Sequence, residues 1–149
     1  TGWQSVMDNN GAEQVFVTQD AGQTWSDVTS NLKEASGVVG KVRPGGLLIV
    51  DLPSNRDRAL LVTTANGVLV QFESDTDHKW ARFGSCSDFP IVLTAALSYE
   101  HYSDTMVAAT FGRGIYKLPN ATQALLKARR GGMDAVPEPF PARYFPPQL

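Results

Sequence analysis

Apolar and polar residues alternate along short runs over most of the chain, and clusters of Gly, Asn, Asp and Pro separate the runs. Such alternation, with enrichment in β-branched and aromatic residues, is typical of β-strands that are buried on one face. The pattern predicts an all-β domain in which Asn66-Gly67 marks a tight hairpin turn. The predicted strands cover residues 3–7, 14–18, 25–29, 47–52, 58–64, 68–72, 80–83, 91–97, 105–110 and 115–118.

These strands recur in an internal repeat. Residues 47–70 align with residues 94–117 without a gap, at an offset of 47 residues that places Asp57 on Asp104. A second offset, of 55 residues, places Trp25 on Trp80 and Asp20 on Asp75. A period of about 50 residues is typical of β-propeller blades, each built from four short strands.

In the turn formed by residues 18–25, nearly every residue has a type that favours a tight turn between two strands. The segment Thr18-Gln19-Asp20-Ala21-Gly22-Gln23-Thr24-Trp25 links two predicted strands. We expect the Asp20 carboxylate to accept hydrogen bonds from backbone N–H groups of its own turn. Gly22 supplies a positive φ without steric cost, and Thr24 favours the strand that follows. Trp25 offers a large apolar face, which we expect to lock the hairpin to its neighbour.

This turn resembles a known motif. It reads S/T-x-D-x-G-x-T-W, the Asp-box of the sialidase-like (BNR repeat) β-propeller superfamily, with Thr18, Asp20, Gly22, Thr24 and Trp25 in the defining positions. That superfamily includes sialidases, xyloglucanase-type glycoside hydrolases, sortilin-type receptors and photosystem II assembly factors. Residues 73–80 resemble a decayed second box that keeps Asp75 and Trp80. Together with the run Thr110-Phe111-Gly112-Arg113-Gly114-Ile115-Tyr116, the likeness covers residues 1–118.

The resemblance implies an incomplete ring. The predicted strands make about two and a half blades, whereas a closed propeller needs about four or more. The first predicted blade lacks its opening strand, and the third lacks its closing strand. We therefore expect residues 1–118 to be the C-terminal blades of a larger propeller, with a processed or truncated N-terminus at Thr1. The other blades would come from a longer polypeptide, from other protein chains or from copies of this one.

The composition changes after residue 118. Residues 119–132 are expected to hold a short helix over 123–130, with Thr122 as its N-cap, and a Gly linker. Residues 133–149 form an extended Pro-rich tail, and we expect its Phe140, Tyr144 and Phe145 to dock on a partner. Asn120-Ala121-Thr122 matches the N-glycosylation acceptor pattern, which is used only in the secretory pathway.

Composition excludes several classes of function. A net charge of −2 and an apolar content of 42% argue against a general nucleic-acid or anionic-membrane surface. No run of apolar residues is long enough to span a membrane. Cys86 is the single cysteine, so an internal disulfide is excluded, and with two histidines it makes no metal-ligand cluster. We predict neither a metal site nor a cofactor.

The resemblance also places a ligand face. In the superfamily the Asp-boxes lie on the face opposite the ligand site, so Asp20 and Asp75 would be structural. The ligand face, for a carbohydrate or a peptide, would carry Asp8, Asn10, Asn66, Asp88 and Arg113. Glycoside hydrolysis needs two carboxyl groups at a set separation, and near this face the sequence offers Asp8 and Asp88. Solvated loop aspartates are the simpler interpretation, so no catalytic residue is assigned.

Two functions follow from this reading. The first is a non-catalytic propeller segment that serves as a protein-interaction scaffold or docking subunit in a larger assembly. The second is the C-terminal part of a secreted glycoside hydrolase, sialidase-like or xyloglucanase-like, whose main catalytic residues lie outside this chain. The acceptor triplet at Asn120 favours a secreted or secretory-pathway protein, and nothing else in the sequence indicates a compartment.

Overall fold

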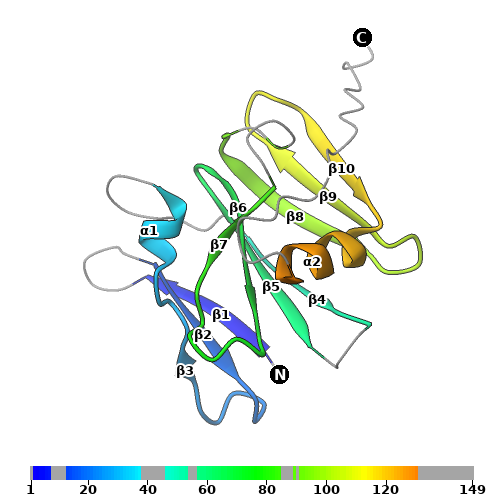
Figure 1. Ribbon diagram of the computed structural model, residues 1–149. Coiled ribbons are helices and arrows are strands. Elements are labelled where there is room, and N and C mark those ends of the chain that lie inside the picture. The colour runs from blue at the N-terminus through cyan, green and yellow to red at the C-terminus, as the bar shows by residue number, and fades with distance from the viewer. Residues whose placement is uncertain are drawn as a thin grey trace.

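The chain folds into three antiparallel sheets that follow one another in sequence (Figure 1). The computed structural model describes residues 2–7, 13–37, 46–53, 57–84, 89 and 91–130. In each sheet, neighbours in space are neighbours in sequence: β1-β2-β3, β4-β5-β6-β7 and β8-β9-β10. The strands are β1 (Gly2–Met7), β2 (Glu13–Thr18), β3 (Ser26–Asp27), β4 (Leu47–Asp51), β5 (Arg58–Thr64), β6 (Gly67–Phe72), β7 (Ala81–Phe83), β8 (Thr94–Glu100), β9 (Thr105–Thr110) and β10 (Ile115–Pro119).

The predicted β-rich class and the antiparallel hairpins are confirmed. β5 and β9 begin and end at the predicted residues. The β5–β6 hairpin turns through Ala65 and Asn66, and Gly67 then takes a φ of 109°, which only glycine adopts without strain. Val62 of β5 lies opposite Leu69 of β6 in the resulting register.

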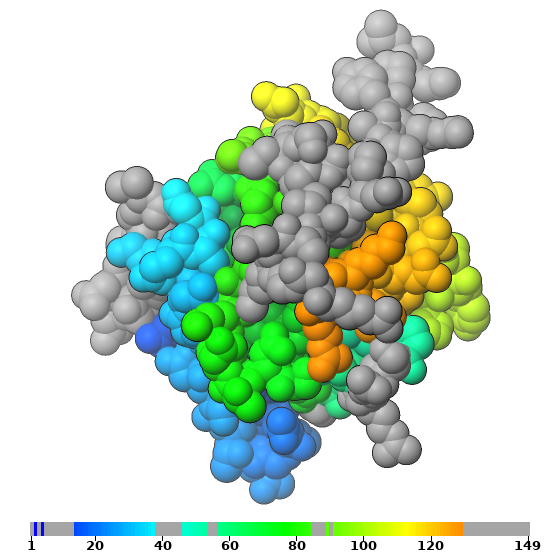
Figure 2. Space-filling view, viewed as in Figure 1, coloured from blue at the N-terminus to red at the C-terminus, as the bar shows by residue number. Residues whose placement is uncertain are grey.

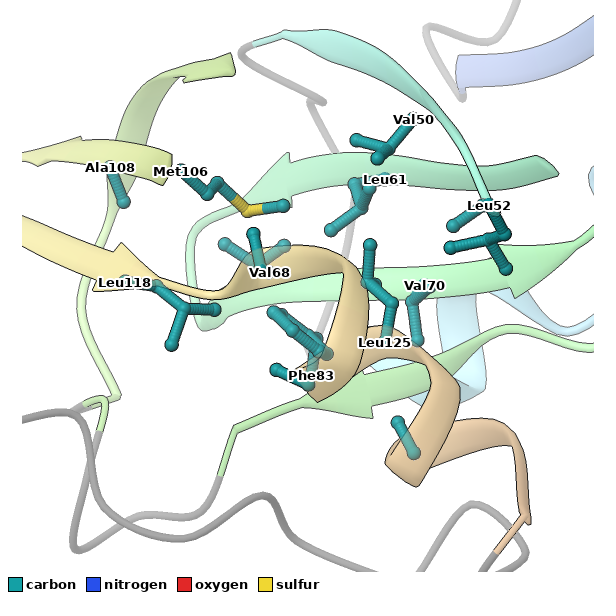
Figure 3. Close-up of a cluster of buried hydrophobic side chains, with 14 of the residues drawn as sticks. Val50, Leu52, Leu61, Val68, Val70, Phe83, Met106, Ala108, Leu118 and Leu125 are labelled. Carbon is teal, nitrogen blue, oxygen red and sulfur yellow. The ribbon is translucent and has the colours of Figure 1, made fainter. Parts of the chain in front are cut away.

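The three sheets are stacked in layers, with the second sheet in the middle. Alternate residues of the middle strands enter two different cores, as period-2 geometry requires. Leu60, Val62 and Leu69 join Val15, Val17 and Trp80 in a core between the first and second sheets. Leu61, Val68 and Val70 join Met106, Ala108 and Leu118 in a core between the second and third sheets (Figure 3). β6 is therefore buried along its whole length, whereas β8 is buried on one face.

Two of the strands predicted from the sequence, 25–29 and 91–97, end two or more residues away from the observed strands. β8 begins at Thr94 and runs to Glu100, three residues beyond the predicted 91–97, because Tyr99 and Glu100 pair with Met106 and Thr105 of β9. β3 is limited to Ser26–Asp27, which lie opposite Val17 and Phe16 of β2. In both cases cross-strand pairing sets the boundary, which local residue type does not reveal.

The segment between β3 and β4, where the strand pattern predicts no element, contains a short helix, α1 (Leu32–Ser36). Leu32 is buried in the core between the first two sheets, which anchors the helix. Gly37 ends it with a left-handed φ of 61°, and its N–H donates to the Glu34 carbonyl. The sequence of this helix has two apolar residues, Leu32 and Ala35, which are too few positions to show a helical period.

The C-terminal helix, α2, runs over Ala121–Arg130 and starts two residues before the predicted 123. Thr122 is inside it and is not its N-cap: its N–H and hydroxyl donate to the two carboxylate oxygens of Asp104, at 2.9 and 2.7 Å. Ala121, Ala124, Leu125 and Ala128 lie in the core between the second and third sheets. In the space-filling view α2 (orange) lies against the second sheet (green), which places it over that core (Figure 2).

No helix in the described part of the chain is long and apolar enough to cross a membrane. The tail residues Phe140, Tyr144 and Phe145 lie outside the described residues.

Candidate functional site

The turn between β2 and β3 is held together by the side chains that the sequence motif specifies. The Asp20 carboxylate accepts the Thr24 N–H on Oδ1 at 2.8 Å and the Thr24 hydroxyl on Oδ2 at 2.6 Å. The Thr18 hydroxyl donates to Asp20 Oδ1 at 2.7 Å and accepts the Gly22 N–H at 2.8 Å. Gly22 has the expected positive φ, 93°. The predicted role of Asp20 as an acceptor within its own turn is thus confirmed.

These hydrogen bonds also set the charge of Asp20. The Thr24 hydroxyl, the Thr24 N–H and the Thr18 hydroxyl lower the pKa of the Asp20 carboxyl from 3.8 to about 2. Each donor stabilises the ionised form, so Asp20 holds no proton at neutral pH and is no general acid. The carboxylate fixes the turn instead.

A pH dependence follows from this lowered pKa. The pKa of Asp20 is lower in the folded chain than its ordinary 3.8, so ionised Asp20 stabilises the fold above that pH, and this contribution is lost as the pH falls toward 2. We expect the gap in thermal midpoint between the wild type and Asp20→Asn to close as the pH falls through this window. Thermal unfolding followed by circular dichroism from pH 6 to pH 2 measures it. A gap that stays constant with pH would contradict the prediction.

Trp25 behaves differently from the expectation. Its indole N–H donates to the Gly22 carbonyl at 3.2 Å, within the turn, and 42% of the residue is exposed. It therefore locks the hairpin to no neighbour within the described residues. A shallow hollow lies beside the ring, lined by Gly2, Thr18, Gln19, Asp20, Ala21, Gly22 and Trp25.

The second, decayed box lies between β6 and β7 and is built another way. Trp80 is 2% exposed, and its indole N–H donates to the Val28 carbonyl of the preceding segment at 3.0 Å. Among the described residues, no hydrogen bond to the Asp75 carboxylate is found, and burial raises its pKa while the Arg129 cation opposes the rise. In this turn the positive φ, 48°, belongs to His78, one residue after the position equivalent to Gly22.

Another aspartate takes over the acceptor role in this second turn. The Asp57 carboxylate, just before β5, accepts the Ser74 N–H at 3.0 Å and the Ser74 hydroxyl at 2.9 Å. Arg129 of α2 completes the group, with its guanidinium 2.9 Å from Asp57 Oδ2 and 2.8 Å from the Ser74 hydroxyl. Asp104 binds Thr122 in the same two-point way in the third sheet. The 47-residue offset had aligned Asp57 with Asp104 and so indicated that the two aspartates have the same role. It did not identify Ser74 and Thr122 as the residues they bind.

Two of the residues predicted for a ligand face, Asn66 and Arg113, lie in the described part of the chain. Asn66 lies in the β5–β6 turn, where its side-chain amide donates to the Ser36 carbonyl at 2.9 Å. The Asn66 carbonyl accepts from Arg82, whose other guanidinium nitrogen donates to the Phe89 carbonyl at 3.1 Å. Asn66 therefore binds α1 and the second sheet together. Asp8, Asn10 and Asp88 lie outside the described residues.

Arg113 lies in the β9–β10 turn, at the end of the third sheet away from the Asp-box turn (Figure 1). It is exposed, and it makes no ion pair with any of the described residues. Around it the third sheet exposes large apolar side chains, and the Phe111 N–H donates to the Leu93 carbonyl at 2.9 Å, which joins the two segments. We call this group the β9–β10 patch: Ile91 (59% exposed), Leu93 (42%), Phe111 (64%), Arg113 and Ile115 (64%).

Three of the described carboxylates hold the local structure together. Asp20, Asp57 and Asp104 are each engaged with a hydroxyl and an N–H of their own structure. Groups of His, Cys, Asp and Glu that could hold a metal ion are absent from the described ranges. Asn120, the acceptor of the glycosylation triplet, is exposed and has a positive φ of 54° just before α2.

Comparison with protein-family models, with curated proteins and with solved structures found no match to this chain.

Proposed function

We propose that this chain is a non-catalytic segment of an Asp-box β-propeller and acts as a protein-interaction scaffold or docking subunit in a larger assembly. Three consecutive antiparallel sheets stacked in layers support the proposal, because blades of a propeller are four-stranded sheets arranged in chain order. The first unit lacks its opening strand, so β1, β2 and β3 count as its second, third and fourth strands. The Asp-box turn then joins the third and fourth strands. The turn from Glu73 to Trp80 stands at the same place in the second sheet.

The repeated two-point binding by aspartate further supports a common unit. Asp57 and Asp104 each precede the second strand of their sheet and each bind the residues that follow the third strand. Along the chain, α2 follows the third strand of the third sheet, as β7 follows the third strand of the second sheet.

The β9–β10 patch carries the docking function in this proposal. Isolated exposed apolar residues are normal, but large apolar side chains grouped at one end of a sheet mark an interaction site. The patch combines aliphatic residues with Phe111 and the unpaired cation of Arg113, and aromatic residues and arginine are enriched where proteins bind each other. The carboxylates of Asp20, Asp57 and Asp104 each bind an N–H and a hydroxyl of the protein itself, and this structural role favours binding over hydrolysis.

A double substitution in the patch tests this function. Phe111→Ser with Ile115→Ser removes two side chains that are each 64% exposed, so the fold should persist while partner binding weakens by about tenfold or more. The measurement is the native mass of the natural protein by light scattering, beside its denatured mass. We expect a wild-type native particle heavier than the denatured chain, and a lighter one for the variant.

Tyr102→Ser is the matched control, because Tyr102 is 98% exposed but lies in the β8–β9 turn, at the other end of the sheet. It should leave the native mass unchanged. A wild-type native mass equal to the denatured mass, unaffected by the double substitution, would contradict the docking function.

A further inference from the structure

One motif of the sequence has no part in the proposed function, the acceptor triplet Asn120-Ala121-Thr122. Asn120 is exposed and lies between β10 and α2, so its backbone belongs to neither element. Its φ of 54° falls in the left-handed region, which asparagine adopts more readily than most residues. The Asn120 carbonyl accepts the Ala124 N–H at 3.1 Å, but its side-chain amide binds no other described residue. This amide can therefore carry a substituent.

The surroundings of Asn120 leave space for a large polar group. The Asp104 carbonyl accepts the Ala121 N–H at 3.0 Å, which places the β8–β9 turn beside the triplet. Ser103 in that turn and Gln123 in α2 are both exposed. Asn120 directly follows the last residue of β10, whereas Ile115 of the β9–β10 patch is the first. A strand of this length spans roughly 15 Å, so Asn120 lies at the end of β10 away from the patch.

The third residue of the triplet is already bound in the folded chain. The Thr122 N–H and hydroxyl donate to Oδ1 and Oδ2 of Asp104, at 2.9 and 2.7 Å, in the first turn of α2. The Tyr99 hydroxyl donates to Asp104 Oδ1 at 3.0 Å and so helps to hold the carboxylate in place. The acceptor pattern requires a hydroxyl at the third position. The fold thus exposes the asparagine of the triplet while it engages the hydroxyl.

We propose that Asn120 carries an N-linked oligosaccharide, which is added before Thr122 binds Asp104 and α2 forms. The donor is an oligosaccharide joined to a lipid pyrophosphate. The Asn120 amide nitrogen forms a bond to the anomeric carbon of the first sugar, and the bond from that carbon to the pyrophosphate oxygen breaks. The amide nitrogen loses one proton, and the lipid pyrophosphate is the leaving group.

The order of events follows from the contacts of Thr122. Before α2 forms, the Asn120 amide and the Thr122 hydroxyl are both available to a transferase. Once Thr122 is bound to Asp104, its hydroxyl is engaged, but the exposed Asn120 still leaves an attached glycan in solvent. The inference is independent of the proposed docking function, because that function resides in the β9–β10 patch.

Peptide mass spectrometry of the natural protein tests the site. An amidase that releases N-linked glycans converts a glycosylated asparagine to aspartate. We expect the treated chain to lose the mass of a glycan and to show Asn120→Asp. In the same cells Thr122→Val should abolish this mass shift, because valine has no hydroxyl, whereas Thr122→Ser should keep it. An unmodified Asn120 in the natural protein would overturn the proposal.

A second experiment tests the order of events. The full chain is produced without glycan, folded, and then treated with the purified transferase and its lipid-linked donor. Asp104→Ala should raise the initial rate of modification by about tenfold or more over the wild type, because Thr122 loses two hydrogen bonds to a charged group. Circular dichroism checks that each variant is folded.

Tyr99→Phe is the matched control for this rate. It removes the third hydrogen bond to Asp104 and keeps both bonds to Thr122, so the rate should stay close to that of the wild type. Equal rates for the wild type and Asp104→Ala would show that the bound hydroxyl does not protect the folded chain, and would overturn the proposed order.

Discussion

Replacing Trp80 with Ala is expected to lower the free energy of unfolding by about 3–5 kcal/mol, the usual cost of removing a buried tryptophan. Trp80 is 2% exposed and lies in the core that holds the first sheet against the second. The substitution leaves a cavity there, and it removes the indole N–H that the Val28 carbonyl accepts at 3.0 Å. Urea denaturation followed by circular dichroism measures the change.

Trp25→Ala is the matched control, because it removes the same side chain from the equivalent turn. Trp25 is 42% exposed and its indole hydrogen bond is local, so in the isolated chain the loss should stay within about 1 kcal/mol. Equal losses for the two variants would show that Trp80 does not join the sheets.

Replacing Asp57 with Ala is expected to cost about 3–5 kcal/mol, because breaking a buried ion pair leaves the partner charge uncompensated. The Asp57 side chain is 3% exposed and that of Arg129 is 28% exposed. The loss reaches the upper part of this range only if α2 stays in place, because the unpaired guanidinium then remains partly buried. The Ser74 N–H and hydroxyl lose their acceptor in the same step. Denaturant unfolding gives the magnitude, and hydrogen exchange at Leu125 reports whether α2 detaches from the core.

Asp51→Ala provides the contrast for that substitution. Asp51 also pairs with an arginine, Arg58, at 3.4 Å, but its side chain is 86% exposed. An exposed ion pair of this kind contributes about 0–1 kcal/mol. If Asp57→Ala cost no more than Asp51→Ala, α2 would be held by its apolar residues alone.

Asp57 and Arg129 together hold α2 against the second sheet. In the second sheet the third strand is followed by a turn and by β7, whereas in the third it is followed by α2. The helix buries Ala121, Ala124, Leu125 and Ala128, and the ion pair of Arg129 with Asp57 holds its far end to the second sheet. This arrangement covers the core between the second and third sheets with a helix.

Much of the local structure was determined by the sequence alone. Alternation predicted the strands, Asn66-Gly67 predicted a hairpin, and the residues from Thr18 to Trp25 predicted a turn closed by the Asp20 carboxylate. These features depend on residues a few positions apart, and their physical causes are side-chain alternation, glycine conformation and short-range hydrogen bonds. The 47-residue and 55-residue offsets likewise predicted that similar groups of strands recur along the chain, because equivalent positions need similar residue types.

Only the tertiary structure decided which of two similar tryptophans is buried. Trp25 and Trp80 follow equivalent turns, and their difference in burial arises from their partners. The segment from Val28 to Asn31 binds Trp80, whereas the indole of Trp25 binds Gly22 of its own turn. The partners of Asp57 also escaped the sequence, since Ser74 and Arg129 lie 17 and 72 residues away in the chain. Burial and long-range pairing depend on how sheets stack, and a pattern read along one strand contains no information about the neighbouring layer.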